Sequence, residues 1–141
     1  MKILERQESE INKIDEGKII DNLSNSLSVN KEKVKDIIHI RNNGAFKFHR
    51  MPGKSNAEKQ QNCVLCSGFI YLVGFQKKTF NSRELTDICY HSGVDTDGLN
   101  YTIRHMKERE LINKAGRRSQ ENILREKGKT LAHKVLHELC K

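Results

Sequence analysis

Two cysteines three positions apart, Cys63 and Cys66, have the spacing in this sequence that comes nearest to a metal site. Cys89 and His91 follow at a distance that would complete a set of four zinc ligands. Both members of the pair, however, fall inside an apolar run with helical character, and neither a second C-x-x-C nor an adjoining glycine knuckle is present. A redox C-x-x-C belongs at a helix N-terminus after a strand, which does not fit this position. We therefore expect buried thiols and no metal.

Other catalytic patterns are weak. Gly53, Lys54 and Ser55 resemble the end of a phosphate-binding loop, but Phe48 stands where the first glycine of that motif is needed, and no hydrophobic strand precedes it. The histidines at positions 39, 49 and 91 are separated by predicted turns, without a Ser or Cys nucleophile in a plausible elbow. No paired carboxylates stand out either. The sequence therefore predicts a protein that is not an enzyme and needs no cofactor.

The charge of the chain favours a polyanionic partner. The 26 lysines and arginines exceed the 18 aspartates and glutamates, which leaves a formal net charge of +8. Residues 1–30 hold 4 basic and 6 acidic side chains, residues 31–60 hold 8 and 3, and residues 61–141 hold 14 and 9. The positive charge thus belongs to the middle and C-terminal parts. Such a balance is typical of nucleic-acid-binding proteins, although it also keeps a protein in solution.

The elements that must position any functional residue are clearest from residue 55 onward. Ser55 and Glu58 form a capping-box pattern that opens a helix ending near Gly74. Asn81 and Ser82 cap a second, short helix that ends near residue 90. Periodicity then predicts a third helix, which is capped by Asp95 or Thr96 and ends near Arg109. Two strands are expected next, over 111–115 and 121–124, with a loop over 116–120 between them. A last helix is expected over 128–139.

The apolar positions of these elements share helical or strand spacing, so they are expected to meet in one core. The predicted core residues are Leu65, Cys66, Phe69, Ile70, Leu85, Ile88, Leu99, Ile103, Met106, Leu111 and Leu131.

The N-terminal part, residues 1–54, predicts a helical extension with a basic loop. A helix is expected within residues 1–23, interrupted at Gly17, and a Ser/Asn-rich joint over 21–30. Ser28 or Asn30 then caps a helix that extends to about Ile40. Phe46 and Phe48 alternate with polar residues, as on a short strand. Residues 41–54 carry five basic or histidine side chains and no acid, which fits either a phosphate-binding arm or an exposed loop.

The order helix, helix, tight turn, helix, β-hairpin, helix over residues 55–140 resembles the winged helix-turn-helix family. The segment "ELINKAGRRSQENILREKGKTLAHKVL" resembles the wing and exit of prokaryotic winged-helix regulators, many of them archaeal. In that pattern Arg125 stands where a capping hydroxyl is usual. The resemblance implies a mainly α fold with a small β-hairpin, in which residues 1–54 form a helical N-terminal extension and residues 55–141 a winged helix-turn-helix domain.

In that family the third helix enters the major groove and the hairpin loop, the wing, lies along the backbone or a minor groove. With Leu99, Ile103 and Met106 turned inward, Tyr101 and Arg104 face outward. Asp97 is expected at the helix start as a cap and Glu108 beyond the groove. The predicted DNA-binding residues are Asn100, Tyr101, Arg104, His105, Lys114, Arg117 and Arg118.

Each of these residues also has a simpler interpretation. Arg117 and Arg118 could form a solvated turn, although two arginines at a loop tip favour a phosphate partner. Tyr101 and Arg104 could belong to a solvated helix face, and a plain surface position is the leading interpretation for His105. A module for protein–protein interaction or RNA binding is therefore the alternative to a DNA-binding regulator.

The expected partner is double-stranded DNA, bound by a homodimer, because one winged helix reads only a few base pairs. Leftover apolar positions, the N-terminal isoleucines and the stripe Leu131, Val135 and Leu139, suggested a dimer contact. The N-terminus turns charged after two apolar residues, unlike a signal peptide, and the longest apolar run, 63–75, is shorter than the roughly 18 residues that span a bilayer. A cytoplasmic protein without a membrane contact is expected.

Overall fold

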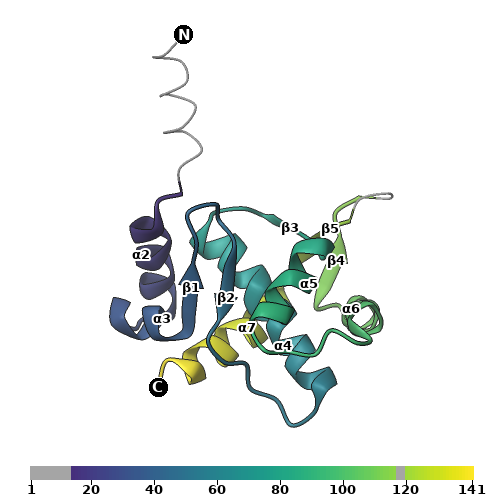
Figure 1. The fold of residues 1–141 in the computed structure, drawn as a ribbon. Helices are drawn as coiled ribbons and strands as arrows, with labels where there is room; N and C mark the ends of the chain where they lie inside the picture. Colours follow the sequence, from purple (N-terminus) through teal and green to yellow (C-terminus); the bar gives the residue numbers. More distant parts are fainter. Residues whose placement is uncertain (1–13, 117–119) are drawn as a thin grey trace.

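The computed structural model describes residues 14–116 and 120–141 and is mainly helical, with two small antiparallel sheets (Figure 1). Helix α4 lies at the centre and packs against α5, α6 and α7. The elements are α2 Glu16–Leu27, α3 Lys31–Ile37, β1 Ile38–Ile40, β2 Phe46–Phe48, α4 Asn56–Phe69, the π-helical turn η1 Ile70–Gly74, β3 Thr79–Asn81, α5 Ser82–His91, α6 Leu99–Glu108, β4 Ile112–Lys114, β5 Glu121–Leu124 and α7 Glu126–Leu139.

The predicted capping box at the start of α4 is confirmed in its first half. The Ser55 hydroxyl accepts a hydrogen bond from the backbone N–H of Glu58 at 3.2 Å. The Glu58 carboxylate reaches one residue further back than the usual pattern and accepts from the N–H of Lys54 at 3.2 Å. The inner face of the helix is buried at every predicted position through Ile70. Local capping and apolar spacing thus account for the central helix.

Three strands form the sheet beside α5 and α6, in the order β3-β5-β4, and all pairs are antiparallel. The hairpin of β4 and β5 was predicted and is confirmed, but β3 was not. Of the three β3 residues only Phe80 is buried, and it pairs with Asn122 of β5. A strand this short has no periodicity of its own, so it depends on the neighbouring strand to define it.

The start of α6 differs from the prediction. The helix begins at Leu99, and none of the predicted caps Asp95, Thr96 and Asp97 caps it with a side chain. The Asp95 carboxylate instead accepts from the N–H of Asp97 at 2.9 Å and so stabilises the preceding turn. Gly98 occupies the cap position at φ +77°, a left-handed conformation that glycine adopts without steric cost. The turn chemistry therefore displaces the helix start by several residues.

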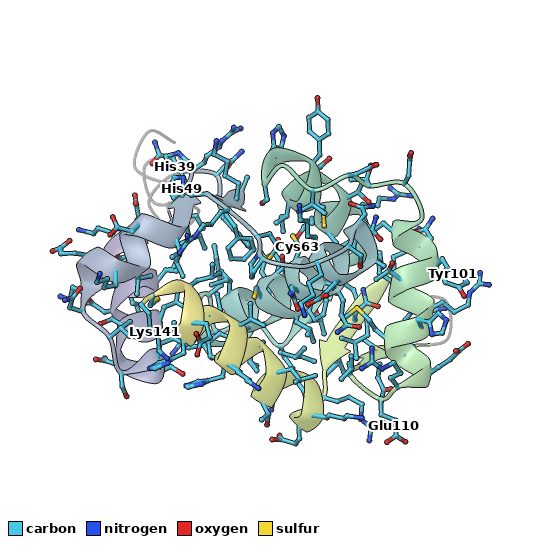
Figure 2. All side chains as sticks on the ribbon, turned by 90° about the horizontal axis from the view of Figure 1, so that it is seen from below. His39, His49, Cys63, Tyr101, Glu110 and Lys141 are labelled. Atoms are coloured by element: carbon cyan, nitrogen blue, oxygen red, sulfur yellow. The ribbon has the colours of Figure 1, made fainter. Side chains whose placement is uncertain are left out.

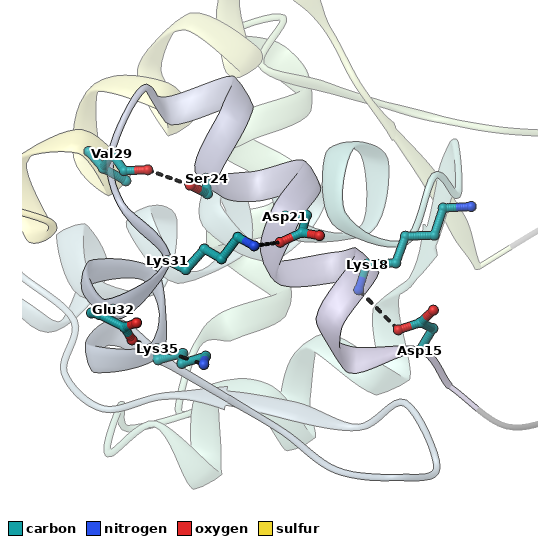
Figure 3. Close-up of polar contacts among 8 residues, drawn as sticks. All are labelled: Asp15, Lys18, Asp21, Ser24, Val29, Lys31, Glu32 and Lys35. Carbon is teal, nitrogen blue, oxygen red and sulfur yellow. Dashed lines mark hydrogen bonds and ion pairs between the residues drawn. The ribbon is translucent and has the colours of Figure 1, made fainter.

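Helix α2 continues through the stretch that was predicted to be a joint. Asp15 caps it by accepting from the N–H of Lys18 at 3.0 Å (Figure 3). The predicted interruption at Gly17 is wrong, because Gly17 lies within the first turn of the helix. Ile19, Leu23 and Leu27 follow one another at intervals of one helical turn, and all three are buried. Burial of this face outweighs the weak helix propensity of the intervening Ser and Asn residues. The Ser24 hydroxyl then donates to the carbonyl of Val29 where the chain turns toward α3.

Helix α3 is shorter than expected. Asn30 caps it, as predicted, by accepting from the N–H of Lys33 at 3.0 Å, but the helix ends at Ile37 instead of Ile40. Residues 38–40 form β1, in which Ile38 pairs with Phe48 across the β1–β2 hairpin. The predicted strand of Phe46 and Phe48 gives residues 38–40 a neighbouring strand to pair with and an apolar face to pack on. The β-branched isoleucines therefore adopt a strand conformation in place of the helix.

Residues from α2 through β2 share one hydrophobic cluster with α4, α5 and α7. Leu139 is buried in this cluster, whereas Leu131 and Val135 are half-buried against it. Ala132 and Leu136 fill the inward face of α7 that the prediction had assigned in part to Leu131. The apolar stripe that suggested a dimer contact is thus largely covered within the chain. The domain boundary at residue 54 stays a prediction.

Among the described residues, none of the helices combines the length and apolar character that crossing a bilayer requires.

Candidate nucleic-acid interface

The outer face of α6 presents a row of polar side chains. Asn100, Arg104 and His105 are exposed, and 64% of Tyr101 is accessible to solvent. The opposite face of the helix buries Leu99, Ile103 and Met106, as predicted. Figure 2 shows Tyr101 on the outer side of α6, away from the body of the protein. The amphipathic pattern therefore turns four of the predicted contact residues to solvent together.

Two of these residues hold one another in place. The Tyr101 hydroxyl lies 3.0 Å from Nε2 of His105, and their ring centroids are 4.9 Å apart. The Glu108 carboxylate is in turn 3.8 Å from Nδ1 of His105. Glu108, which was expected to lie beyond the contact surface, thus belongs to the same row. The Arg104 side chain makes no hydrogen bond or ion pair with any of the described residues, so its guanidinium is available to a ligand.

The base of the hairpin adds a second group of cations. Lys107 of α6 has a pKa that is lowered by burial and, to a smaller extent, by the charge of Lys114 on β4. The positive charge of Lys114 thus acts on Lys107, and a bound anion would favour the charged form of both lysines. Arg109 points elsewhere, since its guanidinium donates to Oε1 of Gln61 at 2.6 Å.

Arg117 and Arg118, the predicted contacts at the tip of the wing, lie outside the described residues. At the base of the hairpin, the N–H of Ala115 donates to the carbonyl of Glu121 at 2.9 Å. Lys114 is thus the wing residue of the predicted set whose position the structure gives.

A buried glutamine that sequence analysis missed positions α6. Gln60 of α4 is only 1% exposed, and its Nε2 donates to the carbonyls of Asp95 and Asp97, both at 2.7 Å. Its Oε1 accepts from the Thr102 hydroxyl at 2.6 Å. One side chain therefore ties the turn before α6 and the first turn of α6 to the central helix. The available signal was a polar residue in helical register with Cys63 and Val64.

A second buried amide, Asn122 of β5, joins the hairpin to α5. Its Nδ2 lies 3.2 Å from the carbonyl of Phe80, 2.9 Å from the Ser82 hydroxyl and 3.1 Å from the carbonyl of Gln120. It is 1% exposed. Asn122 and Leu124 are two positions apart on the strand and so share its inner face, a signal that sequence analysis did not use.

The cysteine pair is buried in α4. Cys63, Cys66 and Cys89 are free thiols with almost no exposure, whereas His91 lies at the surface. A hydrogen bond with Cys89, together with burial, raises the pKa of Cys63, and burial raises that of Cys66. Within residues 14–116 and 120–141, no three His, Cys, Asp or Glu side chains are arranged to hold a metal ion.

Comparison of the chain with protein-family models, with curated proteins and with solved structures finds no match. The function proposed below therefore rests on the surface described here and on the physical properties of its residues.

Proposed function

We propose that this protein binds duplex DNA as a transcriptional regulator, using residues 55–141 as a winged helix-turn-helix domain. The observation that carries the proposal is the exposed polar face of α6. The Arg104 side chain on this face makes no hydrogen bond or ion pair with a described residue, and Lys107 and Lys114 add positive charge at the base of the hairpin. Exposed arginine and asparagine on a helix of this kind can reach base edges, whereas lysines and a wing contact phosphates.

The order of elements supports the same proposal. Three helices, α4, α5 and α6, precede the hairpin, and β3 joins that hairpin in an antiparallel sheet. The buried amides of Gln60 and Asn122 attach α6 and the hairpin to one rigid body. A surface that must match the fixed geometry of a DNA groove benefits from such attachment, because its side chains then lose little freedom on binding.

Arg104, Arg117 and Arg118 have different roles in this proposal. The two wing arginines contact phosphates, so replacing both by alanine should weaken binding to every duplex alike and reduce the slope of log K against log salt by roughly 1.8. Arg104→Ala should cost about 1–3 kcal/mol at a preferred site and less at random duplex. A preference of the wing for A·T-rich DNA would indicate that its arginines enter a narrow minor groove.

The measurement is a salt titration of binding to random duplex DNA and to single-stranded RNA. A Lys18→Ala/Lys134→Ala variant removes the same charge from α2 and α7, away from α6 and the hairpin, and serves as the control. Equal binding of the wing variant and the parent, with an unchanged slope, would remove the wing from the interface. Tighter binding to single-stranded RNA would favour the RNA alternative, for which the exposed Tyr101 offers a stacking platform.

We further propose that DNA is bound by two copies of the chain, because a two-fold operator site requires two recognition helices. Sedimentation at micromolar concentration, with and without DNA, tests this point. A species of monomer mass under both conditions contradicts it.

A further inference from the structure

A cavity of about 560 Å³ lies on another part of the molecule, between the β1–β2 hairpin, η1 and α5. The volume is within the range of about 300–1,000 Å³ that is typical of small-molecule sites. None of the predicted DNA-binding residues lines it. Its walls come from four segments that are distant in the sequence, since Ile14 lines it together with residues of the hairpin, of the η1 region and of α5, and these walls differ in chemistry.

One wall is aromatic. Phe46 of β2, Tyr71 of η1 and Phe75, which follows η1, form a triangle of rings with centroid distances of 5.1, 5.6 and 5.7 Å. Phe46 and Tyr71 are buried, whereas Phe75 is half-buried, and all three border the cavity. Phe75 keeps the most exposed ring of the three, so it can offer a stacked or edge-on contact to a further planar ring, with Phe46 and Tyr71 packed against it.

The backbone beside this wall is unusual in two ways. The chain forms a π-helical turn over Ile70–Gly74, and Gln76 then adopts φ +55°, in the left-handed region. This path brings Lys77 back, so that its N–H donates to the carbonyl of Tyr71 at 2.8 Å and its Nζ lies 5.7 Å from the Tyr71 ring centroid. Isolated π-turns and left-handed non-glycine residues are frequent at binding sites.

The cavity is lined by charges of both signs, which come from different elements. Arg41 and Lys47 belong to the hairpin and Lys77 follows η1, and none of the three makes an ion pair with a described residue. Glu84, Asp87 and His91 belong to α5, and Glu84 accepts a hydrogen bond from the Tyr71 hydroxyl at 2.5 Å. An anionic group is therefore attracted toward the hairpin and repelled from α5, which gives a bound molecule a preferred orientation.

We infer that this cavity binds a small aromatic anion, with its ring against Phe46 and Phe75 and its carboxylate or phosphate group toward Arg41, Lys47 and Lys77. The inference does not depend on the proposed DNA binding, because the cavity shares no residue with that surface. Arginine and lysine bind carboxylate and phosphate groups alike. A ligand that has only an aromatic ring, or only a negative charge, would contact only part of the site.

The test is a titration of the full-length ¹⁵N-labelled protein, followed by amide chemical shifts, with five probes. Indole-3-acetate and phenyl phosphate carry a ring with a carboxylate or a phosphate. Cyclohexanecarboxylate lacks the aromatic ring, benzyl alcohol lacks the charge, and benzylamine reverses it. We expect one or both aromatic anions to shift the amides of Gly44, Phe75 and Lys77 with a dissociation constant in the millimolar range or below, and the other three probes to bind at least tenfold more weakly.

Lys77→Glu is the informative variant, and Lys78→Glu is its matched control, because Lys78 is exposed and does not border this cavity. Lys77→Glu should weaken binding of the aromatic anion at least tenfold, whereas Lys78→Glu should change it less than twofold. The inference is overturned if neither aromatic anion shifts the cavity amides, if benzylamine binds as well as they do, or if the two variants weaken binding equally. A preference for one of the two aromatic anions identifies the acidic group.

Discussion

Gln60→Leu is the substitution that most directly tests how α6 is held. The leucine keeps about the same volume in the interior next to Cys63 and Val64, but it removes the hydrogen bonds to the carbonyls of Asp95 and Asp97 and to the Thr102 hydroxyl. All three bonds are short, at 2.6–2.7 Å, and the side chain that makes them is buried.

The expected loss follows from the surroundings of the three partners. A net hydrogen bond contributes about 0.5–1.5 kcal/mol, and a buried group left without a partner costs about 1–3 kcal/mol. Asp95 and Asp97 belong to an exposed turn, so their carbonyls can be hydrated after the substitution, whereas Thr102 is only 8% exposed and its hydroxyl would be poorly hydrated. We therefore expect the free energy of unfolding to fall by about 2–4 kcal/mol, which corresponds to a decrease in Tm of roughly 6–12 °C.

Urea unfolding followed by circular dichroism measures this loss, and Gln61→Leu is the matched control. Gln61 is the next residue of α4 and loses only an exposed contact with Arg109, so its replacement should cost less than about 1 kcal/mol. In a double-mutant cycle, Gln60→Leu and Thr102→Val should cost less together than the sum of the two, because they remove the same bond. A Gln60→Leu protein within about 0.5 kcal/mol of the parent, or no less stable than Gln61→Leu, would refute this account of α6. Weaker DNA binding by a folded Gln60→Leu protein is expected in addition if the proposed function is right.

Three further predictions concern the interior. Leu99→Ala should lower the free energy of unfolding by about 2–5 kcal/mol because Leu99 is 3% exposed, and a loss below about 0.5 kcal/mol in urea unfolding would show that the inner face of α6 is misplaced. Asn122→Leu should cost about 2–3 kcal/mol through the loss of its contacts with Phe80, Ser82 and Gln120; an unchanged Tm in thermal melts would contradict this. Burial raises the pKa of Cys66 and of Tyr71, so both stay protonated in the folded protein, whereas in the unfolded chain Cys66 ionises above about pH 9 and Tyr71 above about pH 10. Stability should therefore fall as pH rises beyond these values, by up to about 1.4 kcal/mol per pH unit for each group, and less steeply in Cys66→Ala under reducing conditions.

Much of the helical framework could be predicted from the sequence because its signals are local. The cap at Ser55, the cap at Asn81 and the apolar spacing of α4, α5 and α6 act within a few residues of one another. The same periodicity turned Tyr101, Arg104 and His105 outward correctly. A helix shows one face to the core wherever that core lies, so exposure along α6 did not require knowledge of the fold.

The shortest elements and the helix ends could not be predicted in this way. Strands β1 and β3 exist because β2 and β5 lie beside them, and neither contains enough residues to show alternation reliably. Helix α2 passes through a Ser/Asn-rich stretch because its apolar face packs on η1, where Ile19 and Leu23 lie against Gly74. In each case a contact distant in sequence outweighs a local preference of a few tenths of a kcal/mol per residue.

The same distinction between local and long-range contacts applies to the candidate sites. The sequence by itself determined which side chains of α6 face solvent, since that depends on a helical repeat. Only the tertiary structure decided that Gln60 and Asn122 would anchor α6 and the hairpin, that Lys107 would lie near Lys114, and that the rings of Phe46 and Tyr71 would meet. Local spacing determines the direction of a side chain from its own backbone, but proximity between distant segments depends on how the whole chain packs its apolar surface.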